Sequence, residues 1–304
     1  MPDRAVRRRV LSQNFLVDRR AIDALVGGSG AGDGDLGLDI GAGNGLISEA
    51  LGRRGARVVA IERDPALAQR LRAKFATWPA VTVVEGDVLD TPLPAEPFRV
   101  VANIPFGITT KILRRLLDSG ALARADVIVQ AEVARKRGTG GRGTLLNACW
   151  EPWFEFGTGA RIPATAFRPV PRVDTAVLAV TRRDPPLVSP ASRRPYTEFV
   201  TAAFQSARPT VASALAGAIP RARFAGLARE LGFAPGALPS QLDVQQWAGL
   251  FLAAGPAASR SAASRPAPRS RRAGRRPRVP PPGRLDGVGD GRVTGQFPDH
   301  ANHF

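Results

Sequence analysis

The chain contains few of the side chains on which most hydrolytic and metal-dependent sites are built. Among its 304 residues there is one cysteine, Cys149, and both histidines, His300 and His303, lie within the last five positions. One cysteine cannot form a disulfide framework, and no cluster of His and Cys has metal-ligand spacing. These absences exclude a disulfide-stabilised scaffold and a Ser-His-Asp site, and they predict no metal centre. We expect Cys149 to be a small core residue.

Lysines and long apolar segments are also scarce. The 43 basic residues include only Lys74, Lys111 and Lys136 as lysines, and with 26 acids they leave a net charge of +17. No apolar segment is long enough to span a membrane, and the basic N-terminus is not followed by the apolar stretch of a signal peptide. We therefore expect a cytoplasmic protein with no membrane contact. The arginine-rich excess of positive charge favours a polyanionic partner, although a GC-rich genome also enriches arginine.

Four short apolar segments, each followed by a glycine-rich turn or a polar residue, are the main structural signal. Strands are predicted at residues 36–40, 57–61, 81–85 and 98–102, and they are followed in turn by Gly41–Gly45, Glu62, Asp87 and Asn103. In an open α/β sheet such strand ends share one edge, where ligands bind. The spacing G-x-G-x-G departs from the G-x-G-x-x-G of dinucleotide enzymes. An acid about twenty residues after the first glycine suits a ribose diol, and Asp87 suits an adenine amine.

The tetrapeptide at residues 103–106, Asn-Ile-Pro-Phe, leaves the fourth strand end as a stiff turn. Asn103 and the Ile104 carbonyl offer two acceptors, Pro105 fixes the backbone, and Phe106 offers a stacking face. This set fits an exocyclic amine on a planar ring, such as N6 of adenine. Taken alone, the tetrapeptide is equally a strand followed by a turn with a core phenylalanine. The nucleotide pattern upstream favours the binding interpretation.

The motifs together resemble a known family. The glycine turn is similar to that of class I S-adenosylmethionine-dependent methyltransferases. Residues 11–18 (LSQNFLVD), 103–106 (NIPF) and 166–174 (AFRPVPRVD) resemble motifs of the rRNA adenine N6-dimethyltransferases, over roughly residues 9–252. Ser12 and Phe106 favour the Erm branch, which methylates one adenine of 23S rRNA and blocks macrolide, lincosamide and streptogramin B binding. Val173-Asp174 is closer to the branch that modifies two adjacent adenines of small-subunit rRNA.

The resemblance implies a site for S-adenosyl-L-methionine beside a site for the target adenine. The implied cofactor contacts are Asn14 and Leu16 at the methionine end, Gly41 and Gly43 at the methionine and ribose, Glu62 at the ribose hydroxyls, Asp87 and Val88 at the adenine, and Asn103 between cofactor and target. The implied catalytic residues are Asn103, Ile104, Pro105 and Phe106, with Phe167 covering the other face of the flipped base. No metal ligand is implied.

The sequence predicts four segments with different compositions. We expect a basic arm at 1–10, a Rossmann-like cofactor-binding catalytic domain at 11–183, a small all-helical rRNA-binding domain at 184–254, and a disordered Arg/Pro-rich basic tail at 255–304. Within the catalytic domain we expect a helix at 18–26, a flexible glycine-rich link at 27–34, a helix at 108–117, and strands at 126–130 and 176–180. A basic glycine-rich loop is expected at 135–142, with Arg135, Lys136 and Arg137 on rRNA phosphates. The helical domain is expected to hold helices at 197–204, 211–218, 221–231 and 240–252.

The function predicted from these patterns is N6-methylation of a single adenine in 23S rRNA, free or in an assembling large subunit, by a monomeric enzyme. The sequence leaves open whether one or two methyl groups are added. The alternatives are a small-subunit (16S) rRNA dimethylase and a non-catalytic nucleic-acid-binding protein on a methyltransferase scaffold. The presence of Gly41, Glu62, Asp87 and Asn103 argues against a scaffold without activity. A DNA adenine methylase is disfavoured by the N-terminal signature.

Overall fold

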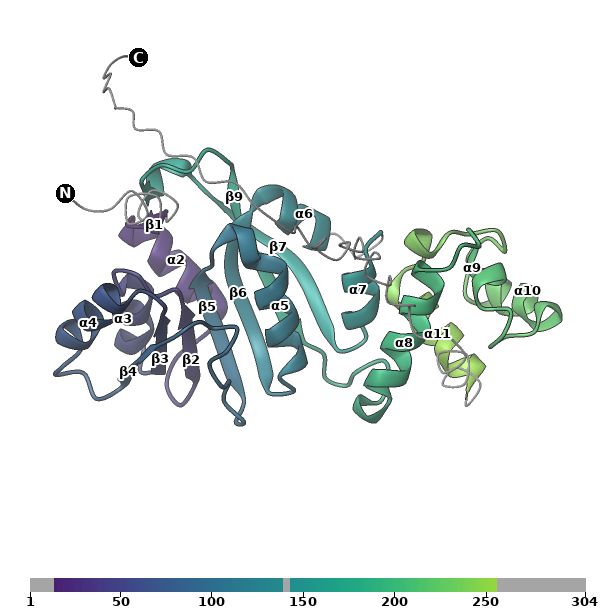
Figure 1. Cartoon of the computed structure of the whole chain (residues 1–304), viewed down its shortest axis with the longest axis horizontal. Coiled ribbons are helices and arrows are strands. Elements are labelled where there is room, and N and C mark those ends of the chain that lie inside the picture. Colours follow the sequence, from purple (N-terminus) through teal and green to yellow (C-terminus); the bar gives the residue numbers. More distant parts are fainter. Residues whose placement is uncertain (1–13, 139–142, 256–304) are drawn as a thin grey trace, which may run out of the picture. The chain divides into compact units, whose positions relative to one another are not determined.

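The computed structural model in Figure 1 describes residues 14–138 and 143–255, which fall within one compact unit. The expectations for the basic arm, for Ser12 and for the tail beyond Gly255 lie outside the described residues. None of the described helices combines the length and the apolar composition needed to cross a membrane.

A seven-stranded sheet in the order β4-β3-β2-β5-β6-β9-β7 forms the centre of the unit. The strands are β2 (Leu36–Ile40), β3 (Arg57–Glu62), β4 (Val81–Glu85), β5 (Phe98–Asn103), β6 (Leu122–Gln130), β7 (Phe154–Ile162) and β9 (Thr175–Arg182). Strands β2 to β6 are parallel, and β9 runs antiparallel between β6 and β7. This confirms the Rossmann-like α/β fold that the sequence predicts. The strand order reverses between β2 and β5, so a crevice for ligands is expected at their carboxyl ends.

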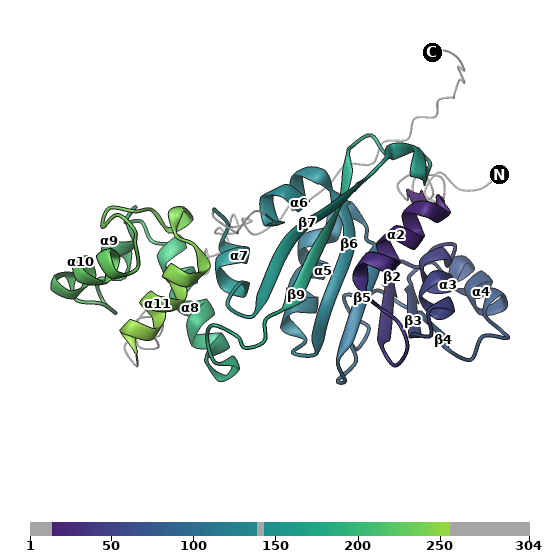
Figure 2. The ribbon, with the colours of Figure 1, turned by 180° about the vertical axis from the view of Figure 1, so that it is seen from behind.

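Helices cover both faces of this sheet. Helices α2 (Arg19–Ser29), α3 (Leu46–Arg53) and α4 (Pro65–Lys74) cover the face seen in Figure 2, and α5 (Thr109–Asp118) lies on the face seen in Figure 1. Residues along β5 alternate between the two sides, as successive strand side chains must. Val100 and Ala102 join the core that contains α5, whereas Val101 joins the core that contains α2 and α3.

The C-terminal part of the unit is helical and shares its core with the sheet. Its helices are α8 (Arg193–Phe204), α9 (Val211–Ala214), α10 (Arg221–Glu230) and α11 (Val244–Ala254), and α6 (Ala131–Gly138) and α7 (Leu145–Trp150) precede them. Tyr196 of α8 makes edge-on ring contacts with Trp153 and Phe251, and its hydroxyl donates to the Ala148 carbonyl of α7 at 3.0 Å. The apolar core therefore continues from the sheet into these helices.

Several element boundaries differ from those expected. Helix α2 runs on to Ser29, so Gly27 and Gly28 are helical and do not belong to a flexible link. Its ends explain this, because the Asp18 side chain accepts from the Ala21 amide at 3.0 Å, and Gly30 closes the helix with a φ of 67°. The expected helix at 211–218 is α-helical only over Val211–Ala214. Strand β6 begins four residues earlier than expected, at Leu122 rather than 126.

Candidate functional site

The polar residues predicted at strand ends lie along one edge of the sheet. Gly41 follows β2, Glu62 ends β3 and Asn103 ends β5, and β2 is flanked by β3 and β5. A Cβ built on Gly41 would lie 3.9 Å from Pro105 Cδ and 4.0 Å from the Asn103 carbonyl oxygen. The glycine turn and the 103–106 turn are therefore neighbours at the point where the strand order reverses.

The glycine turn needs its glycines for two physical reasons. Gly41, Gly43 and Gly45 have φ values of 71°, 56° and 70°, which side-chain-bearing residues rarely adopt. A Cβ on Gly43 would also come within 2.8 Å of the Phe15 ring, so the turn passes directly beneath that ring. The amides of Gly41 and Ala42 donate to the Ile61 carbonyl at 2.8 and 3.2 Å and fasten the turn to β3.

Glu62 is a buried carboxylate held by backbone amides. Its side chain accepts from the Gly43 amide at 2.8 Å and from the Asp64 amide at 2.9 Å, and the residue is 4% exposed. Among the described residues no basic side chain forms an ion pair with it. Backbone amides compensate its burial, and each carboxylate oxygen keeps a second lone pair for hydroxyl donors.

Asp87 follows β4 with its carboxylate oriented by two contacts. One oxygen accepts from the Leu89 amide at 2.9 Å, and the other lies 3.3 Å from Nη1 of the exposed Arg63. Val88 is buried beside it. Arg63 directly follows Glu62, so this ion pair connects the ends of β3 and β4.

Asn103 connects the end of β5 to the N-terminal segment. Its Nδ2 donates to the Asn14 carbonyl at 2.7 Å. Because a carbonyl oxygen only accepts, the amide nitrogen must face Asn14, and the Oδ1 acceptor is turned away from that contact. None of the described residues donates a hydrogen bond to Oδ1 of Asn103.

The N-terminal segment is in turn held by the segment around residue 167. Strand β1 (Phe15–Leu16) pairs antiparallel with β8 (Phe167–Arg168), and the Val17 amide donates to the Ala166 carbonyl at 2.8 Å. Leu16 is buried in the core below this pair. The structure thus brings together three motifs that are widely separated along the chain.

The residues that follow Asn103 differ in exposure. The Ile104 side chain is buried, but its carbonyl accepts no hydrogen bond from the described residues. Pro105 is exposed, and Phe106 is half-buried at the start of a short 3-10 turn, Phe106–Ile108. Phe167 is fully buried in the core, so in this conformation its ring supports the β1–β8 pair and does not line an open base site.

The segment expected as a basic loop is helical in its first half. Residues 135–138 end helix α6, and 139–142 lie outside the described residues. Helix formation is expected from Ala131 to Lys136, which are mostly good helix formers. Arg137 is partly buried and donates to Thr144 Oγ1 and Asn147 Oδ1, both at 3.1 Å. Burial lowers the pKa of Arg137, which acts as a tether between α6 and α7.

This difference predicts separate effects for two adjacent residues. If exposed Lys136 contacts a phosphate as the sequence predicts, Lys136→Ala should weaken RNA binding modestly and reduce the salt slope by about one. Arg137→Ala should instead lower the free energy of unfolding by about 1–3 kcal/mol, since the buried Asn147 loses a partner. RNA binding over a salt series and thermal unfolding would separate the two effects. Unchanged stability of Arg137→Ala would contradict the tether.

Asp39 is a residue at this edge that sequence reasoning did not select. It lies in β2 with 1% exposure, and its carboxyl accepts from the Ser48 amide at 3.0 Å and the Ser48 hydroxyl at 2.6 Å. Burial raises the pKa of Asp39 to about 7, against the lowering effect of the Ser48 hydrogen bonds. It anchors the start of α3 beneath the glycine turn. An acid inside an apolar strand directly before a glycine turn is the sequence signal for it.

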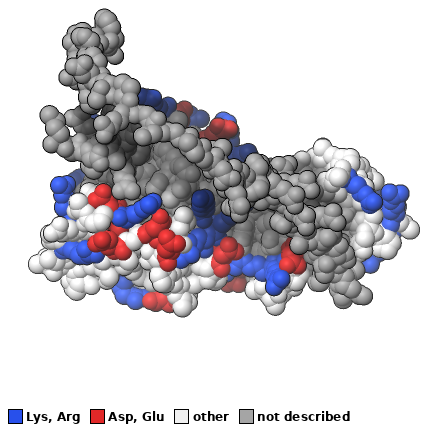
Figure 3. Space-filling view, in the orientation of Figure 1, with Lys and Arg blue, Asp and Glu red and all other residues white. Residues whose placement is uncertain are grey.

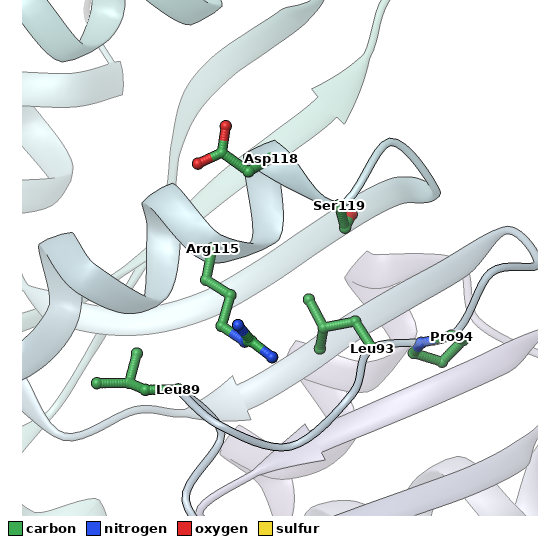
Figure 4. A pocket seen from close by; sticks show the side chains of 6 residues that line it. All are labelled: Leu89, Leu93, Pro94, Arg115, Asp118 and Ser119. Carbon is green, nitrogen blue, oxygen red and sulfur yellow. The ribbon is translucent and has the colours of Figure 1, made fainter.

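A cavity of about 530 Å³ lies elsewhere, between α5 and the segment after β4 (Figure 4). Its lining residues are Leu89, Leu93, Pro94, Arg115, Asp118 and Ser119. Arg115 lies across it and donates to the Thr91 carbonyl at 2.6 Å. The strand-end residues do not line this cavity, so it does not outline the candidate site. In the two described stretches, no three His, Cys, Asp or Glu side chains come together in a way that could hold a metal ion.

Charge is unevenly distributed over the face shown in Figure 3. Acidic side chains accompany the basic ones over the part that holds β3 and β4, whereas basic side chains predominate over the helices at the right of that view. Helix α10 there carries three exposed arginines, Arg221, Arg223 and Arg229.

Comparisons with known proteins show which family the sequence and fold resemble. A family model described as ribosomal RNA adenine dimethylase matches residues 5–254. An rRNA methyltransferase of Streptomyces thermotolerans is 39% identical over 81% of this chain and 82% of its own length. Mycinamicin-resistance protein MyrB of Micromonospora griseorubida is 36% identical over 89% and 85%. The crystal structure of the 23S rRNA methyltransferase ErmE superimposes with a TM-score of 0.72 and 32% identity, covering 79% of this chain and 98% of that one.

Proposed function

Because the chain belongs to the ribosomal RNA adenine dimethylase family, we propose that it N6-methylates a single adenine of 23S rRNA with S-adenosyl-L-methionine and thereby confers macrolide-lincosamide-streptogramin B resistance. The observation that carries the proposal is the Asn103 amide at the strand-order reversal, which Asn14 orients with its acceptor turned away. The names of two similar proteins, a mycinamicin-resistance protein and a 23S rRNA methyltransferase, support the choice of substrate.

The residues at the sheet edge fit the cofactor chemically. Glu62 keeps lone pairs for the ribose hydroxyls, and Asp87 offers an acceptor for the adenine amine with Val88 beside the ring. Gly41 and Gly43 give the turn the positive φ values that place its backbone at the methionine and ribose, and Asn14 and Leu16 close the methionine end from the N-terminal segment. When bound, the cofactor supplies a methyl group that is already activated on a sulfonium.

The chain's own residues then orient and stabilise the target amine. Oδ1 of Asn103 and the Ile104 carbonyl accept from N6, which favours a more tetrahedral nitrogen and stabilises the positive charge that develops there. Pro105 keeps these acceptors in place, and the half-buried Phe106 ring stacks on the flipped base. Phe167 supports the segment that closes the site. The reaction requires no strong base, because positioning provides most of the rate enhancement.

RNA capture is assigned to basic residues around this edge. Arg135 and Lys136 on α6 are exposed and suited to phosphates, and the helices of residues 184–254 form the proposed rRNA-binding domain beside the catalytic domain, residues 11–183. Base specificity comes from the pocket and from RNA shape. We propose that the protein acts as a monomer, on free 23S rRNA or on an assembling large subunit.

The second candidate is dimethylation of two adjacent adenines in small-subunit rRNA, which Val173-Asp174 favours. The test is to express the chain in a macrolide-sensitive bacterium and to map modified adenines in 23S and 16S rRNA by primer extension and mass spectrometry. One modified 23S adenine with macrolide resistance is the expected result. Modification of 16S rRNA alone supports the second candidate, and unmodified rRNA together with no cofactor binding supports a non-catalytic scaffold.

The tail from Pro256 carries ten arginines and three aspartates, a net charge of +7. We expect a chain that ends at Gly255 to keep its thermal stability and cofactor affinity, because the apolar core lies before that point. Its RNA affinity should fall modestly at low salt, and the salt slope should become shallower as phosphate contacts are lost. RNA binding by full-length and truncated protein across a salt series measures this. Coinciding slopes would show that the tail does not touch RNA.

A further inference from the structure

Lys74, the last residue of α4, makes a three-part contact that neither the motifs nor the proposed chemistry uses. Its Nζ lies 3.1 Å from the Asn44 carbonyl oxygen, 3.1 Å from the Gly45 carbonyl oxygen and 2.9 Å from a Glu49 carboxylate oxygen. An ammonium group has three N–H donors, so each one has a fixed acceptor. Two of these acceptors are backbone atoms of the glycine turn.

The second half of the glycine turn, Asn44 and Gly45 (the far end), depends on this contact more than the first half, Gly41 to Gly43 (the near end), does. The near end is tied to β3 through the amides of Gly41, Ala42 and Gly43. At the far end, the Gly45 amide donates to the Ala42 carbonyl at 2.7 Å and the Glu49 amide donates to the Gly45 carbonyl at 3.0 Å, but Lys74 is the only donor among the described residues to the Asn44 carbonyl. The carbonyl and the N–H of one peptide group lie in a single plane, so fixing two carbonyls also fixes the planes of the peptides that lead into α3.

Helix α4 also packs tightly against this end of the turn. A Cβ on Gly45 would come within 2.6 Å of Leu71, which lies in α4, and within 2.9 Å of Phe75, which caps the end of α4 directly after Lys74. The backbone of the turn at Gly45 therefore packs directly on the Leu71 and Phe75 side chains. A change in how α4 docks would be transmitted directly to the turn.

Glu49 holds the ammonium in place from α3. Its side chain is 11% exposed and faces cations from three helices: Arg19 of α2, Arg53 of α3 and Lys74 of α4. The hydrogen bond from Lys74 is the main cause that lowers the pKa of Glu49. A partly buried ion pair of this kind restricts the lysine more than an exposed pair would.

We propose that Lys74 is a positioning residue for the cofactor: seated on Glu49, it holds the Asn44 and Gly45 carbonyls and keeps the turn at Gly41–Gly45 in the conformation that receives S-adenosylmethionine. The inference rests on the proposed function in so far as this turn is the cofactor site. Lys74 does not touch the reacting atoms. Its contribution lies in cofactor affinity and not in the methyl-transfer step.

The test compares Lys74→Met with Lys74→Arg, and with Arg72→Met as the matched control. Arg72 lies on the same helix, but it pairs with Glu85 at 3.0 Å and does not contact the turn. Calorimetry with S-adenosylmethionine should give a Kd raised about tenfold in Lys74→Met, from the loss of charge-assisted hydrogen bonds. Arg72→Met should leave the Kd unchanged, and Lys74→Arg, which keeps the charge but replaces the compact ammonium with a planar fork, should give a Kd between those of wild type and Lys74→Met.

Kinetics and unfolding separate positioning from general stability. In Lys74→Met, KM for the cofactor should rise with the Kd, while kcat at saturating cofactor and KM for RNA stay near wild type. An unchanged Kd in this variant, or an equal rise in Arg72→Met, overturns the inference. Should Lys74→Met not fold, Lys74→Gln carries the same expectation. Wild-type protein that binds no cofactor contradicts the proposed function itself, so the two failures are distinct.

Discussion

Asn103→Ala is expected to reduce adenine methylation by about a hundredfold or more in a protein that remains folded. The substitution removes the Oδ1 acceptor proposed for the target amine, and it also removes the 2.7 Å hydrogen bond to the Asn14 carbonyl. Because Asn103 lies at a strand end and is only partly buried, little apolar packing is lost. Initial rates of methyl transfer to a 23S rRNA fragment at saturating cofactor measure the effect.

Two control measurements make the result specific. Thermal unfolding within a few degrees of wild type would show that the sheet edge is intact, and calorimetry would report whether loosening of the N-terminal segment also weakens cofactor binding. A low rate with retained cofactor affinity assigns the loss to the target amine. Near-normal turnover of the RNA fragment would overturn the assignment of Asn103.

Glu62→Ala and Asp87→Ala are each expected to weaken S-adenosylmethionine binding by roughly 1–3 kcal/mol, through lost charge-assisted hydrogen bonds. We expect the larger loss for Glu62, because its carboxylate also accepts from Gly43 and Asp64 and so holds the glycine turn. Within the described residues, the Asp87 carboxylate contacts only the Leu89 amide and the exposed Arg63. Calorimetric titration of each variant gives the comparison.

Glu85→Ala is the matched control for both acids. Glu85 stands opposite Glu62 in the β3–β4 register and two residues before Asp87, but it pairs with Arg72 on the surface. An exposed ion pair of this kind contributes little to stability, so its removal should leave cofactor affinity unchanged. If Glu62→Ala and Asp87→Ala both match this control, the cofactor does not bind at these strand ends.

The sheet, and the edge at which the predicted site residues meet, were predictable because they follow from strong local patterns. Buried parallel strands are short continuous apolar runs, as in 36–40 and 57–61, and their carboxyl ends must meet at one edge. Because the glycine turn, Glu62, Asp87 and Asn103 each follow a predicted strand, the sequence alone predicted that they lie close together at one edge of the sheet. That part of the prediction needed no knowledge of contacts between distant segments.

Strand β7 was not predicted because its sequence gives no clear strand signal. Gly157 and Gly159 interrupt it, and its residues 159–161 are exposed. Glycine within a strand weakens the local preference and often marks an irregularity, and the β7–β9 register does shift between Thr158 and Arg161. Pairing with β9, and not local sequence, determines this strand.

The expected basic loop at 135–142 was wrong over its first half for a related reason. The glycines from Gly138 onward suggested a loop, whereas the preceding residues favour a helix. The burial of Arg137 could not be read from sequence, because its partners Thr144 and Asn147 belong to the next helix. Of these three consecutive basic residues, Arg135 and Lys136 are exposed, whereas Arg137 is partly buried and connects α6 to α7 through hydrogen bonds.

Orientation and burial at the site itself were beyond sequence reasoning. The Asn103 amide is oriented by a carbonyl 89 residues earlier in the chain. Phe167 is buried because β8 pairs with β1, and no local sequence pattern predicts this pairing. Lys74 reads as an ordinary last-turn lysine of a helix, where cations are common for electrostatic reasons.

The pairing of β1 with β8 also has a consequence for the order in which the protein is made. A ribosome releases Asn14 and the glycine turn early, but residues 167–168 follow only after six of the seven sheet strands have been synthesised. Contacts between such distant segments form late, because closing a long loop costs entropy before the contact can compensate it. An incomplete nascent chain would therefore have its glycine turn before the β1–β8 pair that packs beside it has formed. Under the proposed function, a chain still being synthesised could not methylate rRNA until at least Arg168 has emerged and paired with the N-terminal segment.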